Sequence, residues 1–264
     1  MSDRSEHPPR AIYERIADAL QKQIFDGTYP PGTRLPTIAD LKEKYEVSAI
    51  VIRQAVARLK TQGLVETNRR AGTVVRERPP LRRVAMERYR GETSVGAVPV
   101  EPGQRSTSFT QDHKIAWSEY RLDTDFTRVL ADEELAEWFD LPVGTELLRR
   151  HFVFYARNEP QQISINYMPW QIVGGTPVAD PQREPWPGGT PAQCAFLGKP
   201  ITRVQEAVSS RMPTPEETHT LKMPPGVPVI TISRKMMSDT TVMEVCKDII
   251  LPADRVVLDY SMDL

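Results

Sequence analysis

Hydrophobic positions near the start of the chain predict three helices. The first helix carries an apolar stripe that consists of Ile12, Ile16, Ala19, Leu20 and Ile24. These residues recur at the spacing of one helical face, and Gly27 can close the helix in a left-handed conformation. A short second helix follows Thr37, whose side chain can cap it together with Asp40. A third helix follows the cap Ser48 and stops at Gly63.

Two short β runs, 64–66 and 73–75, follow the third helix and predict a hairpin. Helix, helix-turn-helix and hairpin in this order are typical of a winged helix-turn-helix, whose third helix enters the major groove of DNA. We therefore expect such a domain over residues 1–76.

The pattern changes twice after this domain. Residues 77–108 are rich in Arg, Pro, Gly and Ser and predict a linker. Strands are then expected at 116–122, 147–155, 162–167, 201–212, 227–237 and 242–251, and helices at 132–141 and 214–222. Residues 176–191 hold five prolines and predict an irregular loop. Because strands and helices mix without a regular βαβ alternation, we expect an α+β domain over 109–264.

Charge divides the chain near the same place. The net charge is only -1, but residues 1–90 hold 18 Lys and Arg against 11 Asp and Glu. Residues 91–264 hold 16 against 24. A basic first part joined to an acidic second part indicates that the first part binds a polyanion.

Composition also excludes several classes of protein. No apolar run reaches the roughly 20 residues that a membrane helix needs, and the charged start predicts no secretion signal. Cys194 and Cys246 are too few for a disulfide framework, so we expect a cytoplasmic protein. Neither the cysteines nor the four histidines have metal-ligand spacing, and no nucleotide-binding or hydrolase motif occurs. We therefore expect no metal, no cofactor and no enzymatic activity.

The predicted third helix carries side chains that suit DNA. Ala49, Ile50, Arg53 and Gln54 lie opposite its apolar face. Arg53 can pair with guanine or with phosphate, and Gln54 can bind adenine or contact the backbone. The N–H groups after the cap Ser48 suit a phosphate.

Motifs over about 65 residues resemble the DNA-binding domain of the GntR superfamily of bacterial transcription regulators. They are Tyr13, Ile24, Gly27, Leu41 and Leu59, with the runs 30–32, 35–37, 47–48, 53–55, 63–65 and 72–73. The resemblance implies that DNA is contacted by Arg34, Thr37, Ser48, Ala49, Ile50, Val51, Arg53, Gln54, Arg69, Arg70 and Gly72. At the wing tip, Arg69 and Arg70 can reach the minor groove.

The chain departs from that family's pattern in two places, the start of the third helix and the wing. Ala49, Ile50 and Val51 stand where the family usually has an Arg and two Thr, so apolar groups here can touch thymine methyls. Arg70 replaces the first glycine of the wing, which adds charge. The usual operator sequence therefore need not apply to this chain.

The second domain resembles the UTRA effector domain of the HutC-type branch, which has the chorismate-lyase fold with an antiparallel sheet. The features that carry this resemblance are Pro160 and Arg234 with the runs 141–144, 149–150, 167–169, 211–214, 224–229 and 253–255. The resemblance implies a pocket for a small-molecule effector formed by Arg150, Phe152, Phe154, Ser164, Asn166, Tyr167 and Glu244.

This pocket has two phenyl rings where the family has an Arg pair. Phe152 and Phe154 favour an effector that is more hydrophobic than a sugar phosphate, because phenyl faces accept apolar groups or a cation. Both rings can equally well belong to the core. Arg149 and Arg150 are adjacent on a strand, so at most one points inward.

Together these features predict a homodimeric, ligand-responsive transcription regulator, in particular a repressor that a small-molecule effector releases from a palindromic operator. Two alternatives stay open. One is a constitutive dimeric DNA-binding protein without an effector, and the other is a chorismate-lyase-like enzyme tethered to DNA.

Overall fold

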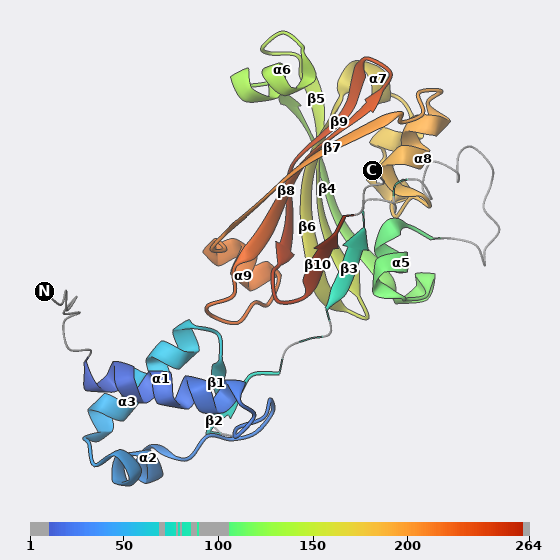
Figure 1. Cartoon of the computed structure of the whole chain (residues 1–264). Coiled ribbons are helices and arrows are strands. Elements are labelled where there is room, and N and C mark those ends of the chain that lie inside the picture. Colours follow the sequence, from blue (N-terminus) through green and yellow to red (C-terminus); the bar gives the residue numbers. More distant parts are fainter. Residues whose placement is uncertain are drawn as a thin grey trace, which may run out of the picture. The chain divides into compact units, whose positions relative to one another are not determined.

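The computed structural model describes residues 11–68, 72–77, 79, 81–85, 89 and 106–260. The chain divides into two compact units, one within residues 1–79 together with 224–227, and the other within 80–223 and 228–264. Figure 1 shows that the first unit is mainly helical and that a large sheet dominates the second.

The first unit consists of α1 (Ile12–Phe25), α2 (Ile38–Tyr45), α3 (Ala49–Thr61), β1 (Val65–Asn68) and β2 (Gly72–Val75). The α2 helix begins where predicted because Thr37 accepts a hydrogen bond from the Asp40 N–H, while the Asp40 carboxylate accepts one from the Thr37 N–H. Such caps satisfy N–H groups that have no partner within the helix. The predicted helix-turn-helix is confirmed.

One apolar core joins the elements of this unit. Its buried residues are Ile16, Ala17, Leu20, Leu35, Leu41, Ile52, Ala55, Val56, Leu59, Val65 and Val75. β1 and β2 pair antiparallel, and the backbone at Arg34 forms a bridge to Val74 on the other side of β2. The core therefore holds α3 and the hairpin in one rigid unit.

The second unit is built on a six-stranded antiparallel sheet. Its strand order is β4 (Tyr120–Leu130), β5 (Glu146–Ala156), β6 (Glu159–Pro169), β9 (Thr241–Pro252), β8 (Val229–Ser238) and β7 (Arg203–Arg211). A separate parallel pair joins β3 (Arg82–Ala85) to β10 (Val256–Asp259). The α+β class with an antiparallel sheet is confirmed.

Helices cover both faces of this sheet, because successive strand residues point to opposite sides. Leu147 packs in one cluster with α6 (Glu133–Phe139), whereas the neighbouring Leu148 packs in another with α7 (Trp170–Val173) and α8 (Gly189–Phe196). The shorter helices are α5 (Ser108–His113) and α9 (Pro215–Thr220). Figure 1 shows α6 apart from α7 and α8.

Three segments differ from the predicted pattern. The first strand of the sheet runs over 120–130 rather than 116–122, because Trp117–Glu119 forms a 3₁₀ turn. The predicted loop 176–191 contains two 3₁₀ turns, Pro177–Ala179 and Pro181–Arg183, and the start of α8. Proline is compatible with a first helical turn, so a high proline content did not exclude these elements.

The predicted linker also contains ordered elements. Its residues 82–85 form β3, where Val84 is buried against the sheet, and Tyr89 is buried in the second unit. The strand β3 pairs with β10 from the far end of the chain. A strand of four residues is too short to show a clear alternation of polar and apolar residues, and the sequence around it does not indicate a partner strand so far away.

Candidate functional site

The exposed face of α3 is the candidate surface for DNA in the first unit. Ile50 is 64% exposed, and Arg53 and Gln54 are also exposed. The opposite face is buried and consists of Ile52, Ala55, Val56 and Leu59. The core therefore fixes the helix while the three exposed side chains remain available to a partner.

The N-terminus of α3 is arranged for a phosphate or a base edge. The Ser48 side chain accepts a hydrogen bond from the Val51 N–H at 3.4 Å. The earlier N–H groups of a first turn have no partner within a helix and favour an anion. Ala49 and Val51 are partly buried, so Ile50 is the most exposed side chain of this turn.

Other predicted contact residues lie elsewhere in the first unit. Arg34 is exposed, and its backbone bridge to β2 holds it beside the hairpin. Thr37 is exposed at the start of α2, and Gly72 begins β2 with a φ of 76°. The predicted wing-tip residues Arg69 and Arg70 lie outside the residues that the structure describes.

A cavity of about 100 Å³ lies in the second unit. Its floor is formed by three cross-strand pairs of β5 and β6, which are Arg150 with Asn166, Phe152 with Ser164, and Phe154 with Gln162. These pairs share one sheet face because alternate strand residues point to the same side. The floor therefore runs from a charged end at Arg150 to an aromatic end at Phe154.

Arg150 is buried, with only 1% of its side chain exposed. Its Nε donates to Asn166 Oδ1 at 2.7 Å and its Nη1 to Gln193 Oε1 at 2.7 Å. Its Nη2 donates to Thr190 at 3.3 Å and to Glu244 Oε1 at 3.4 Å. A buried guanidinium needs such acceptors, since an unpaired buried charge is strongly destabilising.

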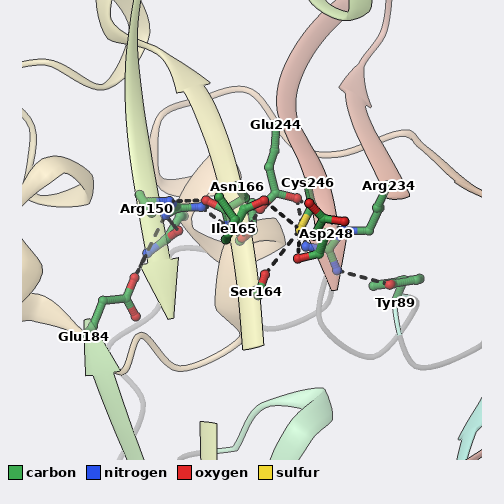
Figure 2. A network of polar contacts seen from close by, with 12 residues as sticks. Tyr89, Arg150, Ser164, Ile165, Asn166, Glu184, Arg234, Glu244, Cys246 and Asp248 are labelled. Carbon is green, nitrogen blue, oxygen red and sulfur yellow. Dashed lines mark hydrogen bonds and ion pairs between the residues drawn. The ribbon is translucent and has the colours of Figure 1, made fainter. Parts of the chain in front are cut away.

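Glu244 connects Arg150 to a second buried arginine. Its Oε2 accepts hydrogen bonds from Arg234 Nη2 at 2.8 Å and from Arg234 Nε at 3.2 Å. Arg234 Nη1 in turn donates to the hydroxyl of Tyr89 at 3.1 Å, and that hydroxyl donates to Glu206. Figure 2 shows Glu244 between the two arginines and Tyr89 beyond Arg234. A continuous polar network thus leads from the cavity to a residue of the predicted linker.

Burial and charge shift the pKa values of groups around this network. Burial alone would lower the pKa of Arg234, but Glu244 and Tyr89 raise it well above its usual value, so the guanidinium stays charged. Burial raises the pKa of Cys194 and of Cys246 to about 12, and the negative charge of Glu244 adds to this increase. Both thiols therefore stay protonated and unreactive near neutral pH.

The aromatic end of the cavity is a cluster of rings. Phe109 lies 5.2 Å from both Tyr120 and Phe154, and Phe152 lies 5.9 Å from Phe154, measured between ring centroids. All four rings line the cavity. Phe152 is also only 5% exposed, so a ring on this floor belongs to the core and to the cavity wall at once.

Five of the seven predicted effector residues line this cavity: Arg150, Phe152, Phe154, Ser164 and Asn166. Glu244 contacts them through Arg150 but is completely buried behind the wall. Tyr167 does not line this cavity, because it follows Asn166 on β6 and packs on the other sheet face with the α6 cluster.

Several cavity residues were not identified from the sequence. Glu184, Trp186 and Thr190 line the cavity from the proline-rich segment 176–191 that was expected to be a loop, and Gln193 follows in α8. Phe109 comes from α5, which was not predicted. No local pattern marks these residues, because the tertiary fold brings them to the sheet.

The helix-turn-helix unit and the cavity-bearing sheet unit together define a DNA-binding regulator with a separate ligand domain. The chain belongs to the GntR family: the model described as bacterial regulatory proteins, gntR family, matches residues 12–75, and the UTRA domain model matches residues 124–256. It is a transcription regulator of the HutC type.

Relatives of known sequence or structure agree with this assignment. An uncharacterized HTH-type transcriptional regulator of Streptomyces coelicolor is 30% identical over 90% of this chain and 87% of its own. The histidine utilization repressor of Klebsiella aerogenes is 25% identical over 94% and 92%. A crystal structure of a GntR-family transcriptional regulator has a TM-score of 0.65 at 31% identity and covers 97% of this chain and 98% of its own.

In the described part of the chain, no helix has both the length and the apolar composition to cross a membrane.

Proposed function

We propose that this chain is a homodimeric repressor that leaves a palindromic operator when a small molecule occupies the cavity of the second unit. The observation that supports it is the pairing of two features in one chain. One is a helix, α3, that exposes Ile50, Arg53 and Gln54 above a buried core, and the other is a cavity lined by charged and aromatic side chains.

A single helix-turn-helix makes few contacts with DNA, which favours a dimer. A single α3 helix reaches only a short half-site, and two linked helices gain affinity on a palindrome without new contacts. We place Arg53 and Gln54 at base edges and Arg34, Arg69 and Arg70 on phosphates or in the minor groove. The second unit then carries the dimer interface.

Release requires the effector to bind one arrangement of the dimer better than another. The polar network from Arg150 through Glu244 and Arg234 to Tyr89 supports this, since it connects the cavity wall to a residue near the N-terminal end of the second unit. An effector that changes the position of Arg150 or Arg234 therefore alters the contacts of Tyr89.

Footprinting on DNA around the protein's own gene tests the first half of the proposal, and protection of two symmetric half-sites is expected. Thermal-shift screening with a metabolite library, followed by operator binding with each hit, tests the second half. Operator binding that no ligand changes would favour a constitutive DNA-binding dimer. Turnover of chorismate would favour an enzyme.

A further inference from the structure

The two arginines that line the cavity of the second unit are already paired within the protein. Each nitrogen of the Arg150 and Arg234 guanidinium groups donates to a protein acceptor. An incoming carboxylate or phosphate would therefore compete with Glu244 for the charge of both guanidinium groups. Replacing Glu244 would leave a buried carboxylate without its partners, which is strongly unfavourable.

Acceptor groups that line the cavity, in contrast, can still accept hydrogen bonds from a ligand. The Glu184 carboxylate lines the cavity and is 8% exposed. It accepts hydrogen bonds from Gln193 Nε2 at 2.7 Å and from the Trp186 N–H at 2.8 Å, and lies 4.0 Å from Arg150 Nη1. A carboxylate offers about four acceptor positions, so Glu184 can accept further donors from a ligand.

The charges of the lining residues point the same way. Arg150 and Arg234 contribute two positive charges, and Glu184 and Asp112 contribute two negative ones. Glu244, which pairs with both arginines, adds a third negative charge directly behind the wall. With Arg82, which lies over the ring of Phe109, the charges around the cavity are balanced, so an anion meets no excess of positive charge.

The aromatic end defines the rest of the ligand. Phe109, Tyr120, Phe152 and Phe154 offer ring faces that accept an apolar body and attract a cation by the ring quadrupole. Gln162 lies beside Phe154 on this floor, and no hydrogen bond joins its amide to any other residue in the described part of the chain. It can therefore orient a polar group of the ligand.

We propose that the effector is a small organic cation, an ammonium group on an aromatic or branched apolar body, with the ammonium bound by Glu184 and the body by the four rings. This inference rests on the proposed sensor function and adds the chemical class of the ligand. It also excludes sugar phosphates, whose charge has the opposite sign.

The test titrates the full chain with three probes that share a phenylethyl body: 2-phenylethylamine, 2-phenylethanol and 3-phenylpropanoate. Calorimetry at pH 7 should give a Kd for the amine at least about tenfold below that for the carboxylate, with the alcohol between them; tenfold corresponds to about 1.4 kcal/mol. Equal or tighter binding of the carboxylate, or no binding of any probe, would overturn the proposal.

Two variants locate the binding site. Glu184→Gln should remove most of the preference for the amine over the alcohol, whereas Glu146→Gln, in an exposed ion pair with Arg128, should retain it. Phe154→Leu should weaken the binding of the amine and of the alcohol alike by about fivefold. This variant tests the site if Glu184→Gln does not fold. A preference that survives Glu184→Gln, or binding unaffected by Phe154→Leu, would place the amine elsewhere.

Operator binding separates this inference from the function on which it rests. If 2-phenylethylamine binds with the expected preference but leaves operator affinity unchanged, the ligand class stands and the sensor function fails. If operator affinity responds to 3-phenylpropanoate and not to the amine, the sensor function stands and the ligand class fails.

Discussion

Replacing Glu244 by Gln should destabilise the second unit strongly. Glu244 is completely buried, and its two oxygens accept from Arg150 and from Arg234, which are 1% and 13% exposed. Glutamine removes the negative charge and turns one oxygen into a donor that faces a guanidinium. Breaking a buried ion pair in this way costs about 3–5 kcal/mol. For a unit of this size, each kcal/mol lowers Tm by about 2–4 °C, so we expect a decrease of about 6–20 °C.

Tryptophan fluorescence provides the assay, because all four tryptophans, Trp117, Trp138, Trp170 and Trp186, belong to the second unit. Urea unfolding followed by this signal reports the sheet unit and not the helical one. Glu146→Gln is the control, since its ion pair with Arg128 is about half exposed and such pairs contribute less than about 1 kcal/mol. A Glu244→Gln variant within about 1 kcal/mol of the wild type would refute the assigned role of the network.

Three further predictions concern the DNA surface, the cavity and pH. Arg53→Ala should weaken operator binding by about 1–3 kcal/mol, measured by fluorescence anisotropy at physiological salt, with the exposed Lys60→Ala as a milder control; unchanged affinity would remove Arg53 from the interface. Phe152→Arg adds a guanidinium with fewer acceptors to the cavity floor and should shift the ratio of amine to carboxylate affinity by about tenfold toward the carboxylate; an unaltered ratio would return Phe152 to a purely structural role. Burial and the nearby Arg82 lower the pKa of His113 to about 3, so this residue binds its proton in the unfolded chain below about pH 6.5 but not in the folded one. Its contribution to stability is therefore present at neutral pH and decreases on acidification from about pH 6.5 to about 3, by about 2 kcal/mol at pH 5; His113→Gln should make the stability of the second unit less dependent on pH in this range, and an identical pH profile would contradict the shift.

Local sequence determined the first unit almost completely. The helices α2 and α3 begin at the side-chain caps Thr37 and Ser48, and apolar stripes on the helices form the core. These interactions span three or four residues, so the pattern alone was enough to find them. The exposed position of Arg53 and Gln54 on α3 follows from the same periodicity.

The resemblance to the UTRA domain pointed to part of the cavity floor, and strand alternation explains why these residues lie together. Arg150, Phe152 and Phe154 are spaced two residues apart and share one face, as a strand requires. The same rule places Tyr167, which is adjacent to Asn166, on the other face of the sheet.

Only the tertiary structure decided which groups surround that floor. Gln193 and Glu244 reach Arg150 from 43 and 94 residues away, and Tyr89 reaches Arg234 from 145 residues away. The pattern around each of these residues reports its own helix or strand and not the partner it will meet. The charge balance of the cavity depends on those partners, because a guanidinium that is paired with a buried carboxylate attracts an anion less strongly.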